Sequence, residues 1–251
     1  MKFKIHSGYK HKASQIKDCI KNFDHTGKIL VDGKRNQLRL FDLNGQNMTI
    51  KGFKIPNLVN RIAYRYFRKS KAQRSFEYAD RLRSLGIGTP APIAFAEADG
   101  PLYGRSFYAC EYIDFDLEFR DLVDNPAYAG DTEILLAFTA FSFLMHEQGV
   151  HFLDHSPGNT LIKKTEAGYQ FYLVDLNRME FKEMNFKERM HNMARLTPKR
   201  EMVTLMSKEY ARLAGYDEQR TINAMWGATE DFQRAFKRKK VLKKKLKFWK
   251  K

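Results

Sequence analysis

Alternating apolar and polar positions mark the first regular part of the chain, over residues 28–54. A period of two is typical of strands that bury one face. Turn residues divide this stretch: Asp32 and Gly33 separate the first run from the second, and Asn44-Gly45 is a strong two-residue hairpin signal. The pattern therefore predicts three antiparallel strands at the beginning of a sheet.

The spacing of apolar residues then changes to that of a helix over residues 57–85, which Gly86 is placed to end. Residues 106–113 are almost wholly apolar and β-prone, which indicates a buried strand. Residues 132–148 are apolar nearly all round a helical wheel, which predicts a central helix that ends at Gly149.

Three further segments complete the pattern. Residues 87–95 form an extended stretch interrupted by proline, residues 169–176 are typical of a strand, and residues 183–235 have helical spacing. Strands and one helix thus come first, and a mainly helical part with a small hairpin follows. This order predicts an α+β fold.

Composition narrows the class of protein. A chain of 251 residues with 43% hydrophobic residues can form one domain, or one domain of two lobes, around a real core. The two cysteines, Cys19 and Cys110, form no CxxC pair, which favours a reducing compartment over a disulfide framework. The chain has no signal-peptide pattern and no run of 18 apolar residues, so we expect a cytoplasmic protein that does not span a membrane.

Positive charge gathers at the C-terminus. The formal net charge is +16, and residues 236–251 carry ten Lys or Arg and no acidic residue. On a helical wheel most lysines of this tail fall on one half, and the apolar residues Val241, Leu242, Leu246, Phe248 and Trp249 fall on the other. A basic tail could bind RNA, but the apolar stripe favours an anionic membrane surface, and we expect no nucleic acid partner.

Candidate chemistry lies on a short turn between two apolar segments. The sequence FLDHSPGNTLI, residues 152–162, contains Asp154 and Asn159, and the strand expected after it ends at Asp175. Phosphoryl transfer needs an aspartate near the acceptor hydroxyl, and an asparagine and a second aspartate that hold magnesium on ATP. The spacing matches the protein-kinase order of catalytic loop and metal aspartate. Taken alone, the same residues also suit an ordinary turn.

With these motifs, the chain resembles the lipopolysaccharide core kinase family, the Kdo/heptose kinases with a protein-kinase-like fold. The resemblance covers residues 28–180. It implies two lobes: an N-terminal antiparallel sheet plus helix, and a mainly helical C-terminal lobe. We accordingly expect an ATP-binding lobe and hinge at 1–111, a catalytic lobe at 112–235 and a basic amphipathic tail at 236–251.

The resemblance assigns the ATP site to three segments. MTIKGFKIPN resembles the strand with the ATP-binding lysine, which makes Lys51 that residue. KAQRSFEYADRLRSLGIGTPAP resembles the next helix, where Glu77 would pair with Lys51. ACEYI resembles the hinge between lobes, where Glu111 and Tyr112 would meet adenine through backbone groups. Glu77 could equally be a surface charge paired with Arg81.

The resemblance also assigns the reaction. Asp154 would accept or orient the proton of the acceptor hydroxyl, and Asn159 and Asp175 would bind Mg²⁺. The chain departs from kinases in several places: Phe152 stands where the loop usually has His, the metal motif reads Asp-Leu-Asn, and only Gly33 marks a phosphate loop. No Ala-Pro-Glu motif follows Asp175, which favours a small or glycolipid acceptor over a peptide.

The expected function is therefore ATP-dependent phosphorylation of an inner-core sugar hydroxyl, with Kdo as the sugar. The substrate would be a lipid A-core precursor at the cytoplasmic face of the inner membrane. Two alternatives stay open: a kinase-fold enzyme for a soluble small molecule or protein, and a non-catalytic kinase-fold binding protein with a nucleic-acid-binding tail.

Two other groups of residues suggest chemistry. His146, His151 and His155 invite a zinc site, but the first two read HExxxH rather than HExxH, so a structural role is the simpler interpretation. Residues 61–74 contain six basic side chains. They suit a solvated helix face or contact with a phosphorylated glycolipid.

Overall fold

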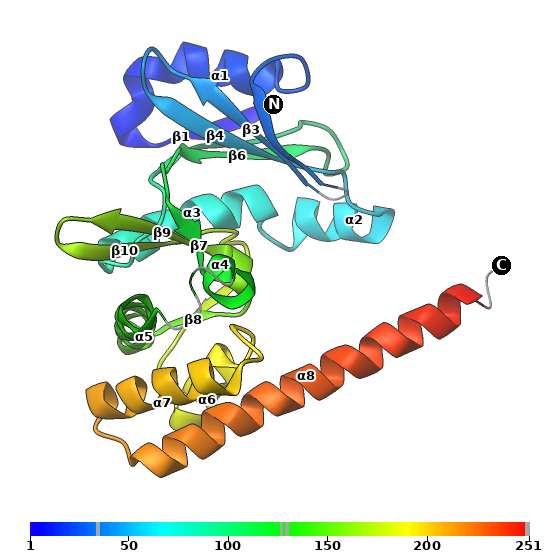
Figure 1. Cartoon of the computed structure of the whole chain (residues 1–251). Coiled ribbons are helices and arrows are strands. Elements are labelled where there is room, and N and C mark those ends of the chain that lie inside the picture. Colours follow the sequence, from blue (N-terminus) through cyan, green and yellow to red (C-terminus); the bar gives the residue numbers. More distant parts are fainter. Residues whose placement is uncertain (34–35, 126–127, 129–130, 249–251) are drawn as a thin grey trace. The chain divides into compact units, whose positions relative to one another are not determined.

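The structure is a computed structural model that describes residues 1–33, 36–125, 128 and 131–248 (Figure 1), with side chains described as far as residue 243. The chain forms two compact units. The first comprises Met1–Asp114 and Tyr172–Arg178, and the second comprises Phe115–Phe171 and Met179–Lys251. The first break lies close to the border expected at residue 111, but the first unit also takes in a short segment from much later in the chain.

The first unit is built on a six-stranded antiparallel sheet with the strand order β1-β5-β6-β4-β3-β2. The strands are β1 (Lys2–Ile5), β2 (Lys28–Asp32), β3 (Asn36–Asp42), β4 (Asn47–Phe53), β5 (Pro92–Glu97) and β6 (Ser106–Glu111). The hairpin predicted at Asn44-Gly45 is confirmed: both residues have positive φ, 55° and 86°, as a tight hairpin turn requires.

The N-terminal segment, which the sequence pattern left without an assigned element, covers one face of this sheet. It forms the 3₁₀ helix η1 (Ser7–Lys12) and the helix α1 (Ala13–Lys21). Ile16 and Ile20, one helical turn apart, are fully buried in a cluster with Phe23 and Ile50. This packing fixes the strand β4 that carries Lys51.

The single helix predicted over residues 57–85 is wrong, because the structure has two helices there. They are α2 (Leu58–Tyr66) and α3 (Lys71–Ser84). Ser70 separates them: its Oγ accepts a hydrogen bond from the Gln73 N–H at 3.0 Å and so begins α3 as an N-cap. Gly86 follows α3 with a φ of 73°, so the predicted end of the helical segment is confirmed.

The second unit is mainly helical, as predicted. Its helices are α4 (Phe119–Asp124), α5 (Thr132–Glu147), α6 (Phe186–Met193), α7 (Arg200–Ala214) and α8 (Glu218–Phe248), with the short helix η3 (Pro157–Asn159). Short strands form a three-stranded sheet, β10-β9-β7, and a two-stranded sheet, β11-β8. They are β7 (Leu117–Glu118), β8 (Val150–Phe152), β9 (Thr160–Thr165), β10 (Gly168–Leu173) and β11 (Met179–Phe181).

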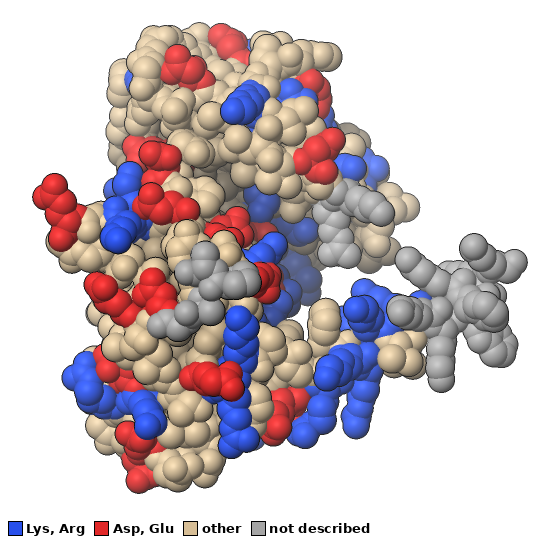
Figure 2. Space-filling model, in the orientation of Figure 1, with Lys and Arg blue, Asp and Glu red and all other residues tan. Residues whose placement is uncertain are grey.

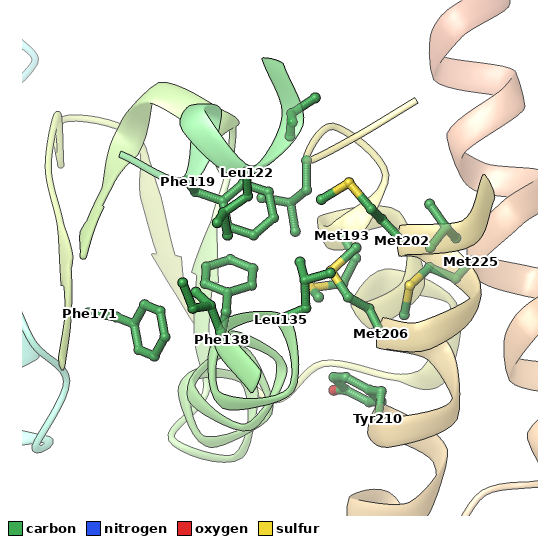
Figure 3. Packing of buried hydrophobic residues seen from close by; sticks show 14 of the residues in the cluster. Phe119, Leu122, Leu135, Phe138, Phe171, Met193, Met202, Met206, Tyr210 and Met225 are labelled. Atoms are coloured by element: carbon green, nitrogen blue, oxygen red, sulfur yellow. The ribbon is translucent and has the colours of Figure 1, made fainter. Parts of the chain in front are cut away.

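The helix α5 lies at the centre of the core of this unit, as its apolar sequence predicted (Figure 3). Phe138 of α5 stacks against Phe119 of α4 with ring centroids 4.2 Å apart, and Met206 and Tyr210 of α7 contribute to the same cluster. Gly149 follows α5 with a φ of 67°. The segment that follows, which contains Asp154, is therefore anchored at its beginning by a well-packed helix.

The helix α8 is continuous from the core to the basic tail, so the border expected at residue 236 lies inside a helix. Met225 is fully buried, whereas every residue of the range 234–243 is exposed. Lys and Arg side chains gather along this exposed part (Figure 2). The predictions for Leu246, Phe248 and Trp249 concern side chains beyond those described. Among the described helices, none combines the length and the apolar character that a membrane span requires.

Candidate active site

Lys51 and Asp175 form an ion pair within the first unit. Lys51 lies on β4 between buried Ile50 and Gly52, and its Nζ is 2.8 Å from Asp175 Oδ1. The Lys51 side chain is 19% exposed, so the cation is partly shielded from water. The structure thus brings together the residues expected to bind the ATP phosphates and the metal.

The backbone holds Asp175 in an unusual conformation. Its φ is 58°, in the left-handed region that non-glycine residues seldom adopt, although aspartate tolerates it better than most. Thr89 Oγ1 donates to Leu173 O at 2.8 Å and so fixes the end of β10 just before this residue. Left-handed residues of this kind concentrate at functional sites, where the surrounding structure holds them in place.

The two residues that follow Asp175 in the Asp-Leu-Asn motif, Leu176 and Asn177, both have a structural role. Leu176 is buried. Asn177 donates from Nδ2 to Asp175 Oδ1, so this carboxylate oxygen accepts hydrogen bonds from both Asn177 and Lys51. Sequence reasoning did not select Asn177. The available signal was a side-chain amide two residues after Asp175, the aspartate expected to bind the metal.

Glu77 is paired differently from the expectation. Its carboxylate accepts hydrogen bonds from Lys69 Nζ at 2.7 Å and from Gln73 Nε2 at 2.9 Å. Burial acts to raise the pKa of Glu77, but these hydrogen bonds outweigh it and the pKa is lowered. The expected Lys51–Glu77 pair is therefore replaced by two others, because Lys69 is closer along the chain and Asp175 engages Lys51.

Glu111 and Tyr112 lie at the end of β6, beside an open pocket of about 630 Å³ that is lined by Gly45, Gln46, Asn47, Glu111, Tyr112 and Asp114. Their backbone N–H groups are both used by the fold: Glu111 donates to Ala91 O at 2.9 Å and Tyr112 to Asn47 O at 3.0 Å. The expected backbone contacts with adenine are therefore restricted to the carbonyl oxygens of these two residues.

The Glu111 side chain is held by the N-terminal segment. The Tyr9 hydroxyl donates to Glu111 Oε1, and Gln46 Nε2 donates to the same oxygen at 3.0 Å. Burial and the neighbouring Glu111 carboxylate raise the pKa of Tyr9 to about 12, so this phenol keeps its proton. Sequence reasoning missed Tyr9, since nothing in the pattern links η1 to a strand end about a hundred residues later.

Asp154 and Asn159 are joined within the second unit, as the turn between them predicted. Asn159 Nδ2 donates to Asp154 O at 2.8 Å, and the Asn159 N–H donates to Ser156 O at 2.9 Å. A side-chain amide that donates through Nδ2 keeps Oδ1 as an acceptor, which is the atom that a metal ligand requires. The Asp154 carboxylate pairs with Arg195, whose Nη1 is 2.9 Å from Oδ1.

Gly158 leaves room within this turn for the Arg120 guanidinium of α4. A Cβ atom at Gly158 would lie 2.1 Å from Arg120 Nη2. The Arg120 side chain is otherwise exposed. The turn that holds the predicted catalytic aspartate therefore carries a cation next to its glycine.

Two of the three candidate zinc histidines are structural. Asn192 of α6 accepts hydrogen bonds at Oδ1 from both His146 and His155, at 3.0 and 3.2 Å, and donates from Nδ2 to Phe152 O at 2.8 Å. Burial lowers the pKa of His146 to about 3 and that of His155 to about 4. Asn192 thus holds the segment before Asp154 in place, and no sequence pattern indicated this role.

His151 has another partner: its Nδ1 lies 3.2 Å from Glu180 Oε2 on the neighbouring strand β11. Across the described part of the chain, no group of three or more His, Cys, Asp or Glu side chains could hold a metal ion. The geometry therefore agrees with the structural interpretation of these histidines.

The fold and these groups of residues define a protein-kinase-like class. A solved structure described as "WaaP in complex with acyl carrier protein" has a similar fold, with a TM-score of 0.63 and 14% sequence identity over 95% of this chain and 99% of that one. A second, the PknI kinase domain of Mycobacterium tuberculosis (C20A_R136N double mutant), has a TM-score of 0.48 and 14% identity over 80% of this chain and 94% of that one. None of the curated proteins matches.

A family model described as "Lipopolysaccharide kinase (Kdo/WaaP) family" matches residues 42–216. The chain therefore belongs to the lipopolysaccharide kinase (Kdo/WaaP) family. The matched range contains every predicted site residue, from Lys51 to Asp175. The resemblance drawn from the motifs and the expected α+β kinase-like fold are both confirmed.

Proposed function

We propose that this kinase transfers the γ-phosphoryl group of ATP to a hydroxyl group of Kdo, in the lipopolysaccharide inner core of a lipid A precursor. The observation that carries the proposal is the Lys51–Asp175 ion pair, 2.8 Å long, on a sheet of the kinase type. A strand lysine beside an aspartate in a left-handed conformation suits the phosphates and metal of a bound nucleotide.

In this proposal Lys51 contacts the α- and β-phosphates of ATP. Asp175 would be a ligand of Mg²⁺, which would supply positive charge beside the phosphates, and Glu77 would be the carboxylate that holds Lys51. Lys69, which pairs with Glu77 in the structure, is 61% exposed, so this ion pair contributes little to stability. Adenine is bound through the backbone carbonyl oxygens of Glu111 and Tyr112, whose N–H groups are used by the fold.

Asp175 and Asn159 are the proposed Mg²⁺ ligands. Both offer oxygen donors, which Mg²⁺ prefers, and two protein ligands suffice because this ion keeps several waters and phosphate oxygens. When bound, Mg²⁺ neutralises charge on the phosphate oxygens. The carboxylate of Asp175 is the stronger ligand, since it is charged and Asn159 is neutral.

Asp154 is the proposed acceptor of the proton. The acceptor oxygen forms a bond to the γ-phosphorus, the bond from that phosphorus to the bridging oxygen of ADP breaks, and the hydroxyl proton passes to the Asp154 carboxylate. Asn159 and Arg195 hold the backbone and the carboxylate of Asp154, which keeps the oxygen aligned. Alignment matters because phosphoryl transfer depends mainly on positioning and charge stabilisation.

Residues 236–251 are the proposed contact with an anionic membrane, at the cytoplasmic face of the inner membrane. The described part of this segment is exposed on all sides of α8, including Phe236, Val241 and Leu242, together with its basic residues. A helix with cations on one half and apolar side chains on the other suits the headgroup region of a bilayer. Deletion of residues 236–251 is expected to reduce sedimentation with anionic vesicles.

The test is phosphate transfer from labelled ATP to a Kdo-bearing lipid A precursor. Asp154→Asn keeps the shape of the side chain and removes its charge, so turnover should fall by roughly 10²–10⁴-fold. Asp116→Asn is the matched control, because the Asp116 carboxylate accepts a hydrogen bond from the Lys164 N–H on strand β9. Full activity of Asp154→Asn would remove Asp154 from its role. Equal transfer to a soluble sugar or a protein would favour the alternative acceptors.

A further inference from the structure

The helix α2 carries a stripe of large apolar side chains that point to solvent. Leu58, Val59, Ile62 and Tyr66 lie within one face of the helix, because residues three, four and eight positions apart fall on the same side. Val59 is 76% exposed, and Phe67, which ends the helix, is 81% exposed. No residue of α2 is buried. Exposed apolar side chains that gather on one face of a helix are typical of interaction surfaces.

The opposite side of α2 is the side attached to the first unit. Tyr64 packs against Tyr103 with ring centroids 5.5 Å apart, and Arg61 Nε donates to Tyr103 O at 2.8 Å. Tyr66, which belongs to the stripe, is also tied to the unit, because its hydroxyl donates to Pro101 O at 3.1 Å. The helix begins at Asn57, whose side chain accepts from the Asn60 N–H at 3.0 Å. The orientation of the stripe is therefore fixed by contacts within the same unit.

Within the segment that carries the stripe every charged side chain is positive, although Asp99 from a neighbouring loop lies close enough to interact with Arg65. No acidic residue occurs from Lys51 to Phe76. Lys54, Arg68 and Lys69 are exposed around the ends of the helix, and Lys69 is the one with a carboxylate partner, Glu77. The surface thus combines apolar side chains at its centre with cations at its rim.

We propose that this α2 surface, residues 54–69, lies on an anionic lipid bilayer, with the apolar stripe among the acyl chains and the cations at the headgroups. An interfacial helix has this combination of apolar face, aromatic ends and basic flanks. A second copy of the chain would bring like charges together, and a nucleic acid would leave the apolar stripe uncovered. The inference does not depend on the proposed reaction and adds a membrane contact distinct from α8.

The experiment measures partition of the full chain between buffer and sedimenting vesicles, with phosphatidylglycerol or with phosphatidylcholine alone. The test variant is Val59→Glu/Phe67→Glu; both side chains are mostly exposed, so the fold should tolerate it. Leu144→Glu on α5 is the matched control, because Leu144 is also an exposed large apolar residue. A third chain carries Lys239→Gln/Lys240→Gln/Lys243→Gln, which weakens the α8 contribution.

The expected result is a loss of about tenfold or more in partition to anionic vesicles for Val59→Glu/Phe67→Glu, in both the native and the Gln-substituted chain. Leu144→Glu should bind like the native chain, and Val59→Leu/Phe67→Trp should retain binding. Unchanged partition of the double Glu variant would overturn the proposal. If the double Glu variant kept its vesicle binding but lost binding to an acidic protein, the surface would bind a protein partner and the proposal would also be overturned.

A catalytic variant separates this inference from the proposed reaction. Asp175→Asn should partition like the native chain, because Asp175 contributes to the nucleotide site and not to the α2 surface. Failure of the native chain to transfer phosphate to a Kdo-bearing lipid A precursor, with intact vesicle binding, would count against the proposed reaction alone. Lost vesicle binding in the α2 variant, with unchanged thermal unfolding, supports the membrane contact whatever the acceptor proves to be.

Discussion

Arg195 holds Asp154 through two adjacent acceptors. A single nitrogen, Nη1, lies 2.9 Å from the Asp154 carboxylate and 3.0 Å from the carbonyl oxygen of Leu153. The same guanidinium lies over the ring of Phe232 on α8, with its carbon 5.5 Å from the ring centroid. Arg195 therefore holds the side chain that is proposed to receive the proton, and the Phe232 ring on α8 stabilises the Arg195 cation.

Removal of this cation should reduce turnover more than ATP binding. Arg195→Ala frees the Asp154 carboxylate to rotate, and misplacement by about 1 Å can cost roughly 10²-fold in rate. We expect kcat to fall by about that factor while KM for ATP changes little, and Arg195→Lys to recover part of the loss. Arg234→Ala is the control, because Arg234 pairs with Asp231 on the exposed part of α8. Loss of ATP affinity in place of kcat would contradict a positioning role.

Lys51 and Lys54 offer a comparison within one short segment. Lys51 is partly buried and paired with Asp175, whereas Lys54 is exposed. Lys51→Ala should raise KM for ATP and lower turnover by tenfold or more, about the effect of 1.4 kcal/mol, because the phosphates lose their cation. Lys54→Ala should leave both constants nearly unchanged. Steady-state kinetics over an ATP titration decides between them, and equal effects of the two substitutions would show that Lys51 has no special role.

Substitutions of Asp175 should separate backbone strain from metal binding. Asp175→Ala places a residue poorly suited to left-handed φ and should lower the free energy of unfolding by about 1 kcal/mol relative to Asp175→Gly. Both variants remove the carboxylate and should lose turnover at every magnesium concentration. Asn159→Ala should be less severe, because a neutral amide contributes less than a charged ligand. Wild-type turnover of either Asp175 variant across a magnesium titration would show that this carboxylate is not the metal ligand.

Protein stability should fall as the pH falls below about 6.5. The folded protein keeps His146 and His155 neutral, with pKa values of about 3 and about 4, whereas unfolded histidine has a pKa near 6.5. Above that pH both rings are neutral in the folded and the unfolded protein, so they do not make its stability depend on pH. Between about pH 6.5 and 4 the unfolded chain binds more protons, so each ring lowers the free energy of unfolding by up to about 1.4 kcal/mol per pH unit.

Thermal unfolding at several pH values tests this linkage. His155→Phe keeps an aromatic ring beside Phe138 and Phe152 and removes one titrating group, so the decline towards acid should become shallower. His191→Asn is the control, because His191 is exposed. An identical pH dependence in native protein and His155→Phe would mean that this ring is protonated in the folded state.

The parts of the fold that could be predicted from sequence depend on local rules. Asn44-Gly45 specifies its hairpin because both residues tolerate positive φ, and Gly149 ends α5 for the same reason. Asp154 and Asn159 were recognisable because they share one turn. In contrast, the pairing of β1 with β5 joins segments about ninety residues apart, and no local pattern encodes that register.

Several partners of the site could not be predicted, for the same physical reason. Arg195 and Asn192 contact the turn that contains Asp154 from α6 and the segment after it, and their partners become visible only once the helices pack. The strand expected to reach residue 176 ends at Leu173, because Asp175 adopts a conformation that no strand allows. The segment expected to form one helix over residues 57–85 divides at Ser70, whose side chain caps the beginning of α3.

The discontinuous first unit has a consequence for protein synthesis. Its contiguous part ends at Asp114, but Asp175 belongs to the segment Tyr172–Arg178 that completes it. A ribosome adding roughly 5–20 residues per second therefore makes Lys51 and its sheet several seconds before the carboxylate that pairs with Lys51 exists. Lys51 therefore lacks its Asp175 partner in the nascent chain throughout that interval. A protein truncated at the end of the sheet would lack this partner permanently.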